Sequence, residues 1–401
     1  MFENIIIEPR RANTDGQGLT RAVLDPLADR GSTVVPIASK RQERPWQGSL
    51  SSVDDEPFPP DETCLLCPGG KRANGKTTPK FDVGLLFEND FPVLSPGTDL
   101  EVANFSSLPL IEPPHSISQL YDQENDPAAI SLTGECWVGV YSPEHDRVMS
   151  KMNPDEIRKH AIEMYVTGYN MLGGLIRVGE NKGKSVGNSL IHPHIQIYAD
   201  HKILPLQHGL SLRAQKDWQS RDGKNMMLEI TDFELKHRSK DIIYANKDWA
   251  FYIWPFGVYP FEAVITPRHH IANMSDLMDN EKKSLAEVMA IMTRTLAVAF
   301  ARPNRGAEYM MMAFQEPKDD SKYPYQDLYF RVKTYLRQLD LTKYFAVMES
   351  MGQYQRDTTI QWWVKRIKKA SEEVMKLGVD DEVDLTELSQ RFNIASSIFN
   401  S

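Results

Sequence analysis

The order of its expected elements restricts the fold of this 401-residue chain more than any other feature. Strand-like runs, a helix and further strand-like runs occur in that order, and the same order then occurs again. The two halves share little sequence identity, so the repeat is one of order only. It predicts an α+β fold, built from a duplicated unit on antiparallel sheets flanked by helices. We expect two domains, residues 1–208 and residues 209–401.

The first unit contains a helix with clear boundaries. Asn153 can cap its N-terminus, Pro154 suits the first helical position, and two acidic residues follow in the first turn. The helix is expected to end near Leu172, before the Gly173-Gly174 pair. The other expected elements are strands at 83–87, 136–141, 175–178 and 191–199, with a glycine- and lysine-rich loop at 179–187.

The second unit repeats this order. Its expected strands are 242–245, 250–254, 263–266, 310–315 and 328–332, around a helix at 280–300. Apolar residues at helical spacing along 285–299 indicate that this helix packs against a core. A further amphipathic helix is expected at 358–375. The first 60 residues are expected to form an extended arm, with a short strand at 5–7.

Composition and charge exclude several classes of protein. The net charge of −9 and the pI of about 5.7 do not suggest a nucleic-acid partner. No apolar run approaches the roughly 20 residues that span a bilayer, and the start of the chain lacks the features of a signal peptide. Three cysteines cannot form a disulfide framework. We therefore expect a cytoplasmic protein without a membrane partner.

The tripeptide His192-Pro193-His194 is the most informative stretch for chemistry. On an extended segment, two imidazoles at this spacing point to the same face of the strand. The proline between them fixes φ and removes a backbone donor, so the pair is held stiffly. One histidine can therefore hold a metal while the other acts on a substrate.

Two of the cysteines have the spacing of metal ligands. Cys64 and Cys67 precede a Pro-Gly-Gly turn that lets both thiolates face one ion, and with two histidines they supply a tetrahedral zinc set. The alternative is a pair of ordinary buried thiols. Cys136 lies in an apolar run and is expected to be a buried core thiol.

His194 is the candidate nucleophile. An imidazole that attacks phosphorus divides one difficult displacement into two easier ones, provided that the attacking nitrogen is neutral. Gln196 lies two residues on, on the same strand face, and can donate amide hydrogens to phosphoryl oxygens. The alternative is a stable strand with two hydrogen-bonded histidines. The preceding loop, 181–189, suits a phosphate through its glycines and lysines, or is a solvated connection.

These segments together resemble the galactose-1-phosphate uridylyltransferase family, a branch of the histidine-triad superfamily. The resemblance extends from about residue 43 to 355. In the first half it rests on Glu43-Arg-Pro-Trp-Gln-Gly48, Cys64-x-x-Cys67, Phe87-Glu-Asn-Asp-Phe91, Ser142-Pro-Glu-His145, Glu180-Asn-Lys-Gly183, Gly187-x-Ser189 and His192-Pro-His-x-Gln196. In the second half it rests on Trp254-Pro-Phe256, Tyr259-Pro-Phe-Glu262 and Pro267-Arg-His-His270.

The resemblance implies a role for each matching residue. Zinc would be held by Cys64, Cys67, His145 and His192. His194 would form a nucleotidyl-histidine, with Gln196 and Ser189 on the phosphates. The remaining substrate contacts implied or expected are Arg44, Arg72, Asn89, Asp90, Asn181, Lys182, Gly183, Lys343, Glu349 and Gln355. A homodimer is also implied, because subunits of the family pair and share their active sites.

Three departures from the family's pattern mark this chain. The position between His194 and Gln196 is usually glycine, and here it is Ile195, whose side chain should point to the opposite strand face and find room there. The family's second metal site keeps only His270, so we predict no second metal. Arg331 stands in the segment that replaces two histidines, as a substrate contact or as a salt-bridged structural residue.

The expected function is transfer of a nucleoside monophosphate, UMP by family likeness, from a nucleotide sugar to a sugar 1-phosphate. One alternative ends the same intermediate with phosphate or pyrophosphate, as a phosphorylase does. Another is a non-catalytic nucleotide-binding protein that kept the zinc and the fold.

Overall fold

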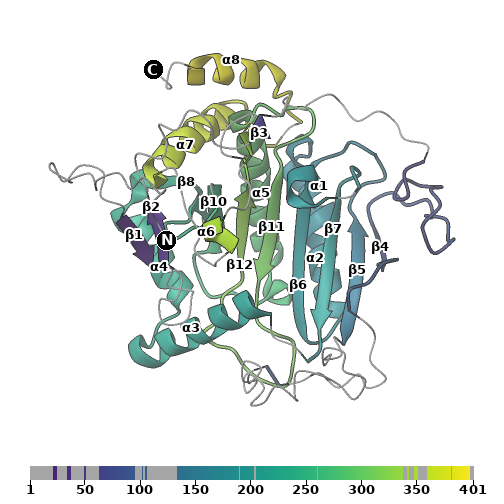
Figure 1. Ribbon diagram of the computed structural model, residues 1–401, viewed down its shortest axis with the longest axis horizontal. Helices are drawn as coiled ribbons and strands as arrows, with labels where there is room; N and C mark the ends of the chain where they lie inside the picture. The colour runs from purple at the N-terminus through teal and green to yellow at the C-terminus, as the bar shows by residue number, and fades with distance from the viewer. Residues whose placement is uncertain are drawn as a thin grey trace, which may run out of the picture.

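The computed structural model describes most of the chain (Figure 1). The described residues are 63–94, 102, 104–105, 133–188, 190–202, 205–259, 261–336, 359–380 and 382–397, with short elements at 21–24, 34–37, 49–50, 341–342 and 347–350. The strand expected at 5–7 and most of the expected N-terminal arm lie outside these ranges.

A nine-stranded sheet forms the centre of the described structure. Every neighbouring pair of its strands is antiparallel, which confirms the predicted α+β class. In spatial order the strands are β4 (Leu85–Glu88), β5 (Gly134–Val140), β7 (His194–Asp200), β6 (Leu175–Lys182), β11 (Tyr309–Phe314), β12 (Tyr329–Thr334), β10 (Phe261–Pro267), β9 (Trp249–Ile253) and β8 (Ile242–Ala245). Two smaller sheets pair β1 (Arg21–Leu24) with β2 (Val34–Ile37) and β3 (Ser49–Leu50) with β13 (Leu341–Thr342).

The strands of the two halves form two contiguous blocks of this sheet. β4, β5, β7 and β6 make the first block, and β11, β12, β10, β9 and β8 make the second. The blocks meet where β6 pairs with β11. In chain order the first block has two strands, a helical segment and two more strands, and the second has three strands, a helix and two more strands, so both follow the order strands, helix, strands that the sequence predicted. The division at residue 208 stays a prediction, and this residue lies within a helix.

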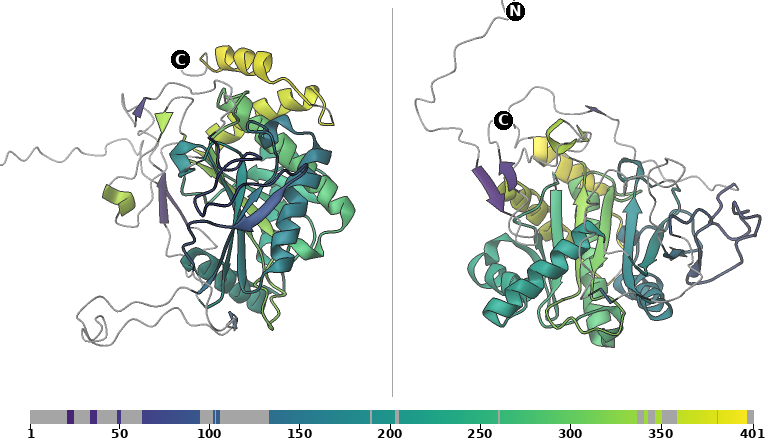
Figure 2. Two further views of the ribbon diagram at one scale, coloured as in Figure 1. Left: turned by 90° about the vertical axis from the view of Figure 1, so that its right-hand side faces the viewer. Right: turned by 60° about the horizontal axis from the view of Figure 1, so that its bottom comes forward.

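Helices cover both faces of the sheet (Figures 1 and 2). They are α1 (Pro154–Ile157), α2 (Glu163–Met171), α3 (Leu206–Asp222), α4 (Met226–His237), α5 (Asp279–Ala299), α6 (Val347–Ser350), α7 (Ile360–Lys376) and α8 (Thr386–Ser397). The main core packs α1, α2, α5 and α7 on one face, while α3 and α4 pack on the other face over the second block. Among the described helices, none is both long and apolar enough to cross a membrane.

The register shows which side chains share a face, because residues directly opposite in an antiparallel pair project to the same side. Gln196 of β7 is opposite Gly179 of β6, which is opposite Met312 of β11, which is opposite Arg331 of β12. We call this side the Gln196 face. The opposite side carries Ile195 and the main core.

The helix predicted to begin after Asn153 is confirmed. The Asn153 side chain accepts a hydrogen bond from the Glu156 backbone, and the Glu156 carboxylate accepts one from the Asn153 backbone, both at 2.9 Å. These bonds satisfy two of the backbone donors that a helix start leaves open. The helical segment continues through a π-helical turn at Arg158–Ile162 and ends at Met171, before the two glycines.

Two expected boundaries around the histidines are wrong. β6 runs on to Lys182, where a loop was expected from residue 179, because Glu180 and Lys182 are both buried by groups from distant parts of the chain. β7 begins at His194, so His192 lies in the loop before the strand rather than on its face. The two imidazoles therefore do not occupy neighbouring positions of one strand face.

Four helices were not expected from the sequence: α3, α4, α8 and the short α6. The inner side of α3 makes polar contacts, so apolar periodicity does not reveal it. Ser211 hydrogen-bonds the Tyr329 hydroxyl at 2.9 Å, and Gln215 donates to Gln326 at 2.7 Å. Such pairs between distant residues leave no local pattern.

The Ile195 side chain packs over a glycine of the neighbouring strand β5. It is fully buried in the main core, and its partner on β5 is Gly139. A Cβ atom at Gly139 would lie 2.7 Å from the Ile195 side chain and 2.3 Å from the Met164 sulfur. The branched side chain therefore occupies space that any larger residue at 139 would take, on the side of the strand away from His194.

Replacing Ile195 by alanine should lower the free energy of unfolding by about 2–5 kcal/mol, because a cavity remains where the side chain packed. Urea denaturation measures this loss. Val83→Ala, at a side chain that is 46% exposed, is the control and should change the stability by less than about 0.5 kcal/mol. Equal small effects of both variants would contradict the packing role.

Candidate metal centre and active site

Four side chains from three segments converge at one end of the first block. They are Cys64, Cys67, His145 and His192, and one ligand atom from each lies within 4.8 Å of all the others. The Cys67 sulfur is 3.4 Å from Nδ1 of His145 and 3.3 Å from Nδ1 of His192. The Cys64 sulfur is 3.8 Å from Nδ1 of His192. Among the described residues, no other group of three or more such side chains meets in this way.

These distances match a tetrahedral metal site. With usual zinc bond lengths to sulfur and nitrogen, two tetrahedral ligand atoms lie about 3.6 Å apart. The residues therefore fit a metal ion held by two thiolates and two imidazoles. Sequence spacing predicted the cysteine pair, and the structure brings both histidines to it.

The local chain is shaped to present both cysteines. Gly70 donates its backbone N–H to the Cys67 carbonyl at 2.8 Å, which closes the turn after the pair. A Cβ atom at Gly70 would lie 2.1 Å from the Cys64 carbonyl oxygen, so this close approach requires glycine. Apolar residues of β4 and β5 pack beneath the turn.

His192 is oriented by a second hydrogen bond. Its Nε2 lies 2.8 Å from the Ser142 carbonyl oxygen, which can only accept, so Nε2 carries the proton and Nδ1 is left for a metal. Burial lowers the pKa of His192 to about 4, and the neutral ring is the form that binds metals.

His194 carries its proton on the other ring nitrogen, Nδ1. Its Nδ1 donates to the His192 carbonyl oxygen at 2.8 Å, so the lone pair is on Nε2. The residue is only 6% exposed, and burial lowers the pKa of its imidazole. A neutral ring with a free Nε2 is the state that a nitrogen nucleophile needs.

Gln196, the next residue on this face, is fixed by a neighbour that the sequence reasoning missed. The Tyr198 hydroxyl donates to the Gln196 side-chain oxygen at 2.7 Å. Burial raises the pKa of Tyr198, so its hydroxyl keeps the proton that it donates. With the amide oxygen engaged, the NH₂ group of Gln196 is left to donate. The sequence signal for Tyr198 was its position two residues after Gln196, which places a second polar side chain on the same strand face.

Tyr198 is itself part of a chain of contacts. The Arg177 guanidinium lies 5.3 Å from the centre of the tyrosine ring and pairs with the Asp200 carboxylate at 2.6 Å. Arg177 is directly opposite Tyr198 on β6. The contact with Arg177 of the neighbouring strand therefore helps to fix the position of the Tyr198 ring, whose hydroxyl binds Gln196.

Several other predicted residues lie on or beside the Gln196 face. Phe87 of β4 is opposite Val138, which is opposite Gln196, and the Arg72 guanidinium lies 4.1 Å above the Phe87 ring. Asn89 follows β4, and its backbone N–H donates to the Cys136 carbonyl at 2.8 Å. One buried carboxylate oxygen of Asp90 has no hydrogen-bond partner in the described structure. Asn181 lies two residues beyond Gly179 and shares its face.

Known proteins are similar to this chain in sequence along most of its length. Residues 12–205 match the family model "Galactose-1-phosphate uridyl transferase, N-terminal domain". A galactose-1-phosphate uridylyltransferase of Haemophilus influenzae is 27% identical over 353 residues, covering 87% of this chain and 93% of that protein. The corresponding rat protein is 29% identical over 269 residues, 66% of this chain and 65% of its own length. Over most of its length the chain is similar to galactose-1-phosphate uridylyltransferases.

Solved structures share the fold. A uridylyltransferase structure superposes with a TM-score of 0.63 at 24% identity, covering 83% of this chain and 98% of that one. An ADP-glucose phosphorylase from Arabidopsis thaliana, solved with bound ADP-glucose, gives a TM-score of 0.62 at 20% identity, covering 88% and 99%. The relatives are named as enzymes, which agrees with the prediction from the sequence that this chain is an enzyme.

The segment that departs from the family's second metal site carries other interactions here. Tyr329 hydrogen-bonds Ser211 and stacks on Phe314, with ring centres 4.9 Å apart. Arg331 pairs with the buried carboxylate of Glu262. These contacts favour a structural role for Arg331, about three strand spacings, or about 14 Å, from Gln196. Its substrate contact stays a prediction.

Not every predicted site residue joins the others. Lys182 alternates with Asn181 and projects from the opposite side of β6, so its amino group is directed away from His194. Four predicted residues lie outside the described ranges: Arg44, Ser189, Lys343 and Gln355. Glu349 lies in α6, with its side chain outside the described part.

Cys64 and Cys136 offer a matched test of the metal centre, because both are buried thiols and only Cys64 belongs to the cluster. Cys64→Ala should reduce the metal bound per chain to well below one, because a three-ligand site binds more weakly. Cys136→Ala should leave it unchanged. Elemental analysis of the purified proteins measures the content. Equal metal content in both variants would overturn the assignment.

Proposed function

We propose that this protein is a nucleotidyltransferase that moves a nucleoside monophosphate between sugar 1-phosphates through a covalent bond to Nε2 of His194. The observation that carries the proposal is the hydrogen bond from Nδ1 of His194 to the His192 carbonyl, which leaves the Nε2 lone pair available. We propose UMP as the transferred group, because the curated relatives are named uridylyltransferases.

The reaction proceeds in two displacements. Nε2 of His194 attacks the α-phosphorus of a nucleoside diphosphate sugar, and the bond from that phosphorus to the bridging oxygen breaks. The sugar 1-phosphate leaves with the electron pair. A phosphate oxygen of a second sugar 1-phosphate then attacks the same phosphorus, the P–N bond breaks, and the imidazole is again neutral. Similar bonds are exchanged, so the protein contributes positioning and charge stabilisation.

Polar groups around His194 would supply that stabilisation. The NH₂ group of Gln196, oriented by Tyr198, would donate to a phosphoryl oxygen as charge develops. Ser189 would hold a second phosphate oxygen. The nucleoside and sugar would contact the remaining residues carried over from the family resemblance: Arg44, Arg72, Asn89, Asp90, Asn181, Gly183, Lys343, Glu349 and Gln355.

We propose zinc as the metal of the cluster formed by Cys64, Cys67, His145 and His192, since two thiolates and two imidazoles in a tetrahedron are a typical zinc set. When bound, the ion would serve as a structural cross-link between the loop of residues 63–80 and the start of β7. A cytoplasmic homodimer is also proposed. Cysteines outside disulfides suit a reducing compartment, and pairing is the arrangement that the family resemblance implies.

A phosphorylase is the alternative with a shared first step. One solved structure with this fold is an ADP-glucose phosphorylase, although its 20% identity establishes the fold alone. In that reaction inorganic phosphate, rather than a sugar 1-phosphate, would discharge the same intermediate. The two functions therefore differ only in the acceptor.

Incubation of the full chain with UDP-glucose, UDP-galactose or ADP-glucose should add one nucleotidyl group, detected by intact mass spectrometry. His194→Ala should form no adduct, because it lacks the attacking nitrogen. His237→Ala, at an exposed histidine of α4, is the control and should form it normally. Discharge of the adduct by a sugar 1-phosphate supports the transferase, and discharge by phosphate alone supports the phosphorylase. Nucleotide binding without any adduct would overturn both.

Tyr198→Phe removes the hydroxyl that orients Gln196. It should slow adduct formation by about two- to tenfold, the range expected for one lost neutral hydrogen bond. The effect should vanish in a Gln196→Ala background, because the hydroxyl then has no amide to hold. Stopped-flow or quenched measurements of adduct formation give all four rates. The same fold-change in both backgrounds would contradict the positioning role.

A further inference from the structure

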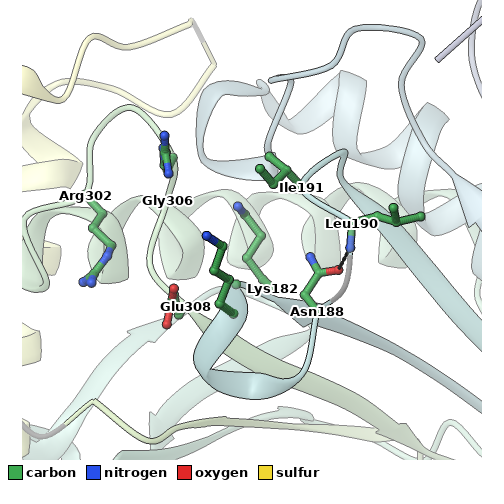
Figure 3. A pocket seen from close by; sticks show the side chains of 10 residues that line it. Lys182, Asn188, Leu190, Ile191, Arg302, Gly306 and Glu308 are labelled. Carbon is green, nitrogen blue, oxygen red and sulfur yellow. Dashed lines mark hydrogen bonds between the residues drawn. The ribbon is translucent and has the colours of Figure 1, made fainter. Parts of the chain in front are cut away.

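A pocket lies at the end of β6, between the loop that leads to β7 and the loop that leads from α5 to β11 (Figure 3). The first wall includes Lys182, Lys184 and Asn188, and the second includes Arg302 and Arg305. In Figure 3, side chains from both loops converge on one space. The walls are more than 100 residues apart in the sequence, and the pairing of β6 with β11 brings them together.

This pocket is separate from the site of His194. Lys182 projects from the side of β6 opposite to the Gln196 face, so its amino group cannot serve both places. His194 and Gln196 are not among the lining residues. From the segment between β6 and β7, residues 183, 184, 188, 190 and 191 line the pocket.

Positive charge dominates the pocket. Four cationic side chains line it, against the single carboxylate of Glu308, in a chain whose net charge is −9. Part of that carboxylate is engaged by the loop, since it accepts a hydrogen bond from the Ser185 backbone at 3.3 Å. Gly183 also packs against it, and a Cβ atom there would lie 2.3 Å from the Glu308 side chain.

The cations repel one another. Arg302 is only 4% exposed and Lys182 only 6%. Burial, with a smaller contribution from the charge of Arg305, lowers the pKa of Lys182 to about 8, while the carboxylates of Glu180 and Glu308 act in the opposite sense. The same cations also contact neighbouring protein groups. It is the excess of positive charge in a partly enclosed space that favours an anion.

We propose that this pocket binds a phosphate-type dianion, as inorganic phosphate or as a phosphate monoester, at a site distinct from the reacting phosphates. A dianion would be shared between Arg305 and Lys184, one from each loop, with Lys182 beneath. Guanidinium and ammonium groups both bind phosphate, the first through paired hydrogen bonds and the second as a point charge. The anion would thereby join the two loops.

The test is a calorimetric titration of the full chain with inorganic phosphate and, separately, methyl phosphate, at constant ionic strength. The wild type and His194→Ala should bind equally, since the pocket does not use the nucleophile. Arg305→Gln and Lys184→Gln should each weaken binding by about tenfold or more, because each removes a charged hydrogen bond worth 1.5–3 kcal/mol. Lys216→Gln, at an exposed lysine of α3, is the matched control and should bind as the wild type does.

Neither test residue is deeply buried, so both variants should fold, and circular dichroism and thermal unfolding would verify this. Binding of methyl phosphate as tight as that of phosphate would identify the monoester group as sufficient, whereas binding of phosphate alone would identify the free ion. No saturable binding to the wild type, or equal affinity in Arg305→Gln, would overturn the proposal. His194→Ala lacks the nitrogen that would form the nucleotidyl adduct. Phosphate binding by this variant therefore tests the pocket independently of the proposed function.

Discussion

The pairing of β6 with β11 is the contact on which the rest of the structure depends. It joins the two blocks into one sheet, and it supports the strand that lies beside β7. Glu180 of β6 is fully buried at this junction, where the hydroxyls of Tyr141 and Tyr309 each donate to its carboxylate at 2.7 Å. Burial raises the pKa of Glu180, and without these donors the desolvated carboxyl would be costly. Tyr141 comes from the first block and Tyr309 from the second. The buried carboxylate of the first block therefore depends on a hydrogen-bond donor from the second.

Within the first block, His192 links the metal centre to the candidate nucleophile through different atoms of one residue. Its ring faces the cysteines, and its carbonyl oxygen accepts a hydrogen bond from Nδ1 of His194. The position of this peptide group therefore sets both the ligand geometry and the tautomer. A disturbance at the metal would change the direction in which Nε2 of His194 points, even though the two imidazoles lie on different elements.

The sequence was informative where local chemistry determines structure. The cap at Asn153, the strand that follows the histidine motif and the Cys64–Cys67 pair all have short-range patterns, and the structure has each of them. It was uninformative where distant groups decide. Glu180 and Lys182 have the composition of a loop, yet tertiary partners place them in a buried strand.

The same distinction applies to the sites. Family resemblance supplied the expected roles of residues along one stretch of chain, whereas the expected role of Tyr198 comes from its hydrogen bond to the Gln196 amide. Arg302 and Arg305 have no motif around them, and only the sheet topology brings them beside Lys184. The sequence predicted a loop at Asn181 and Lys182, and the strand register was needed to show that these two residues lie on opposite sides of the sheet.

This placement has a consequence for control of the enzyme. The segment between β6 and β7 lines the cationic pocket through residues 183, 184, 188, 190 and 191, and it leads along the chain to His194. If an anion in the pocket changes the affinity for a nucleotide at His194, the nucleotide must change the affinity for the anion by the same factor, in the same direction. The two ligands then form one thermodynamic cycle, and measuring either affinity as a function of the other ligand gives the coupling free energy of this segment.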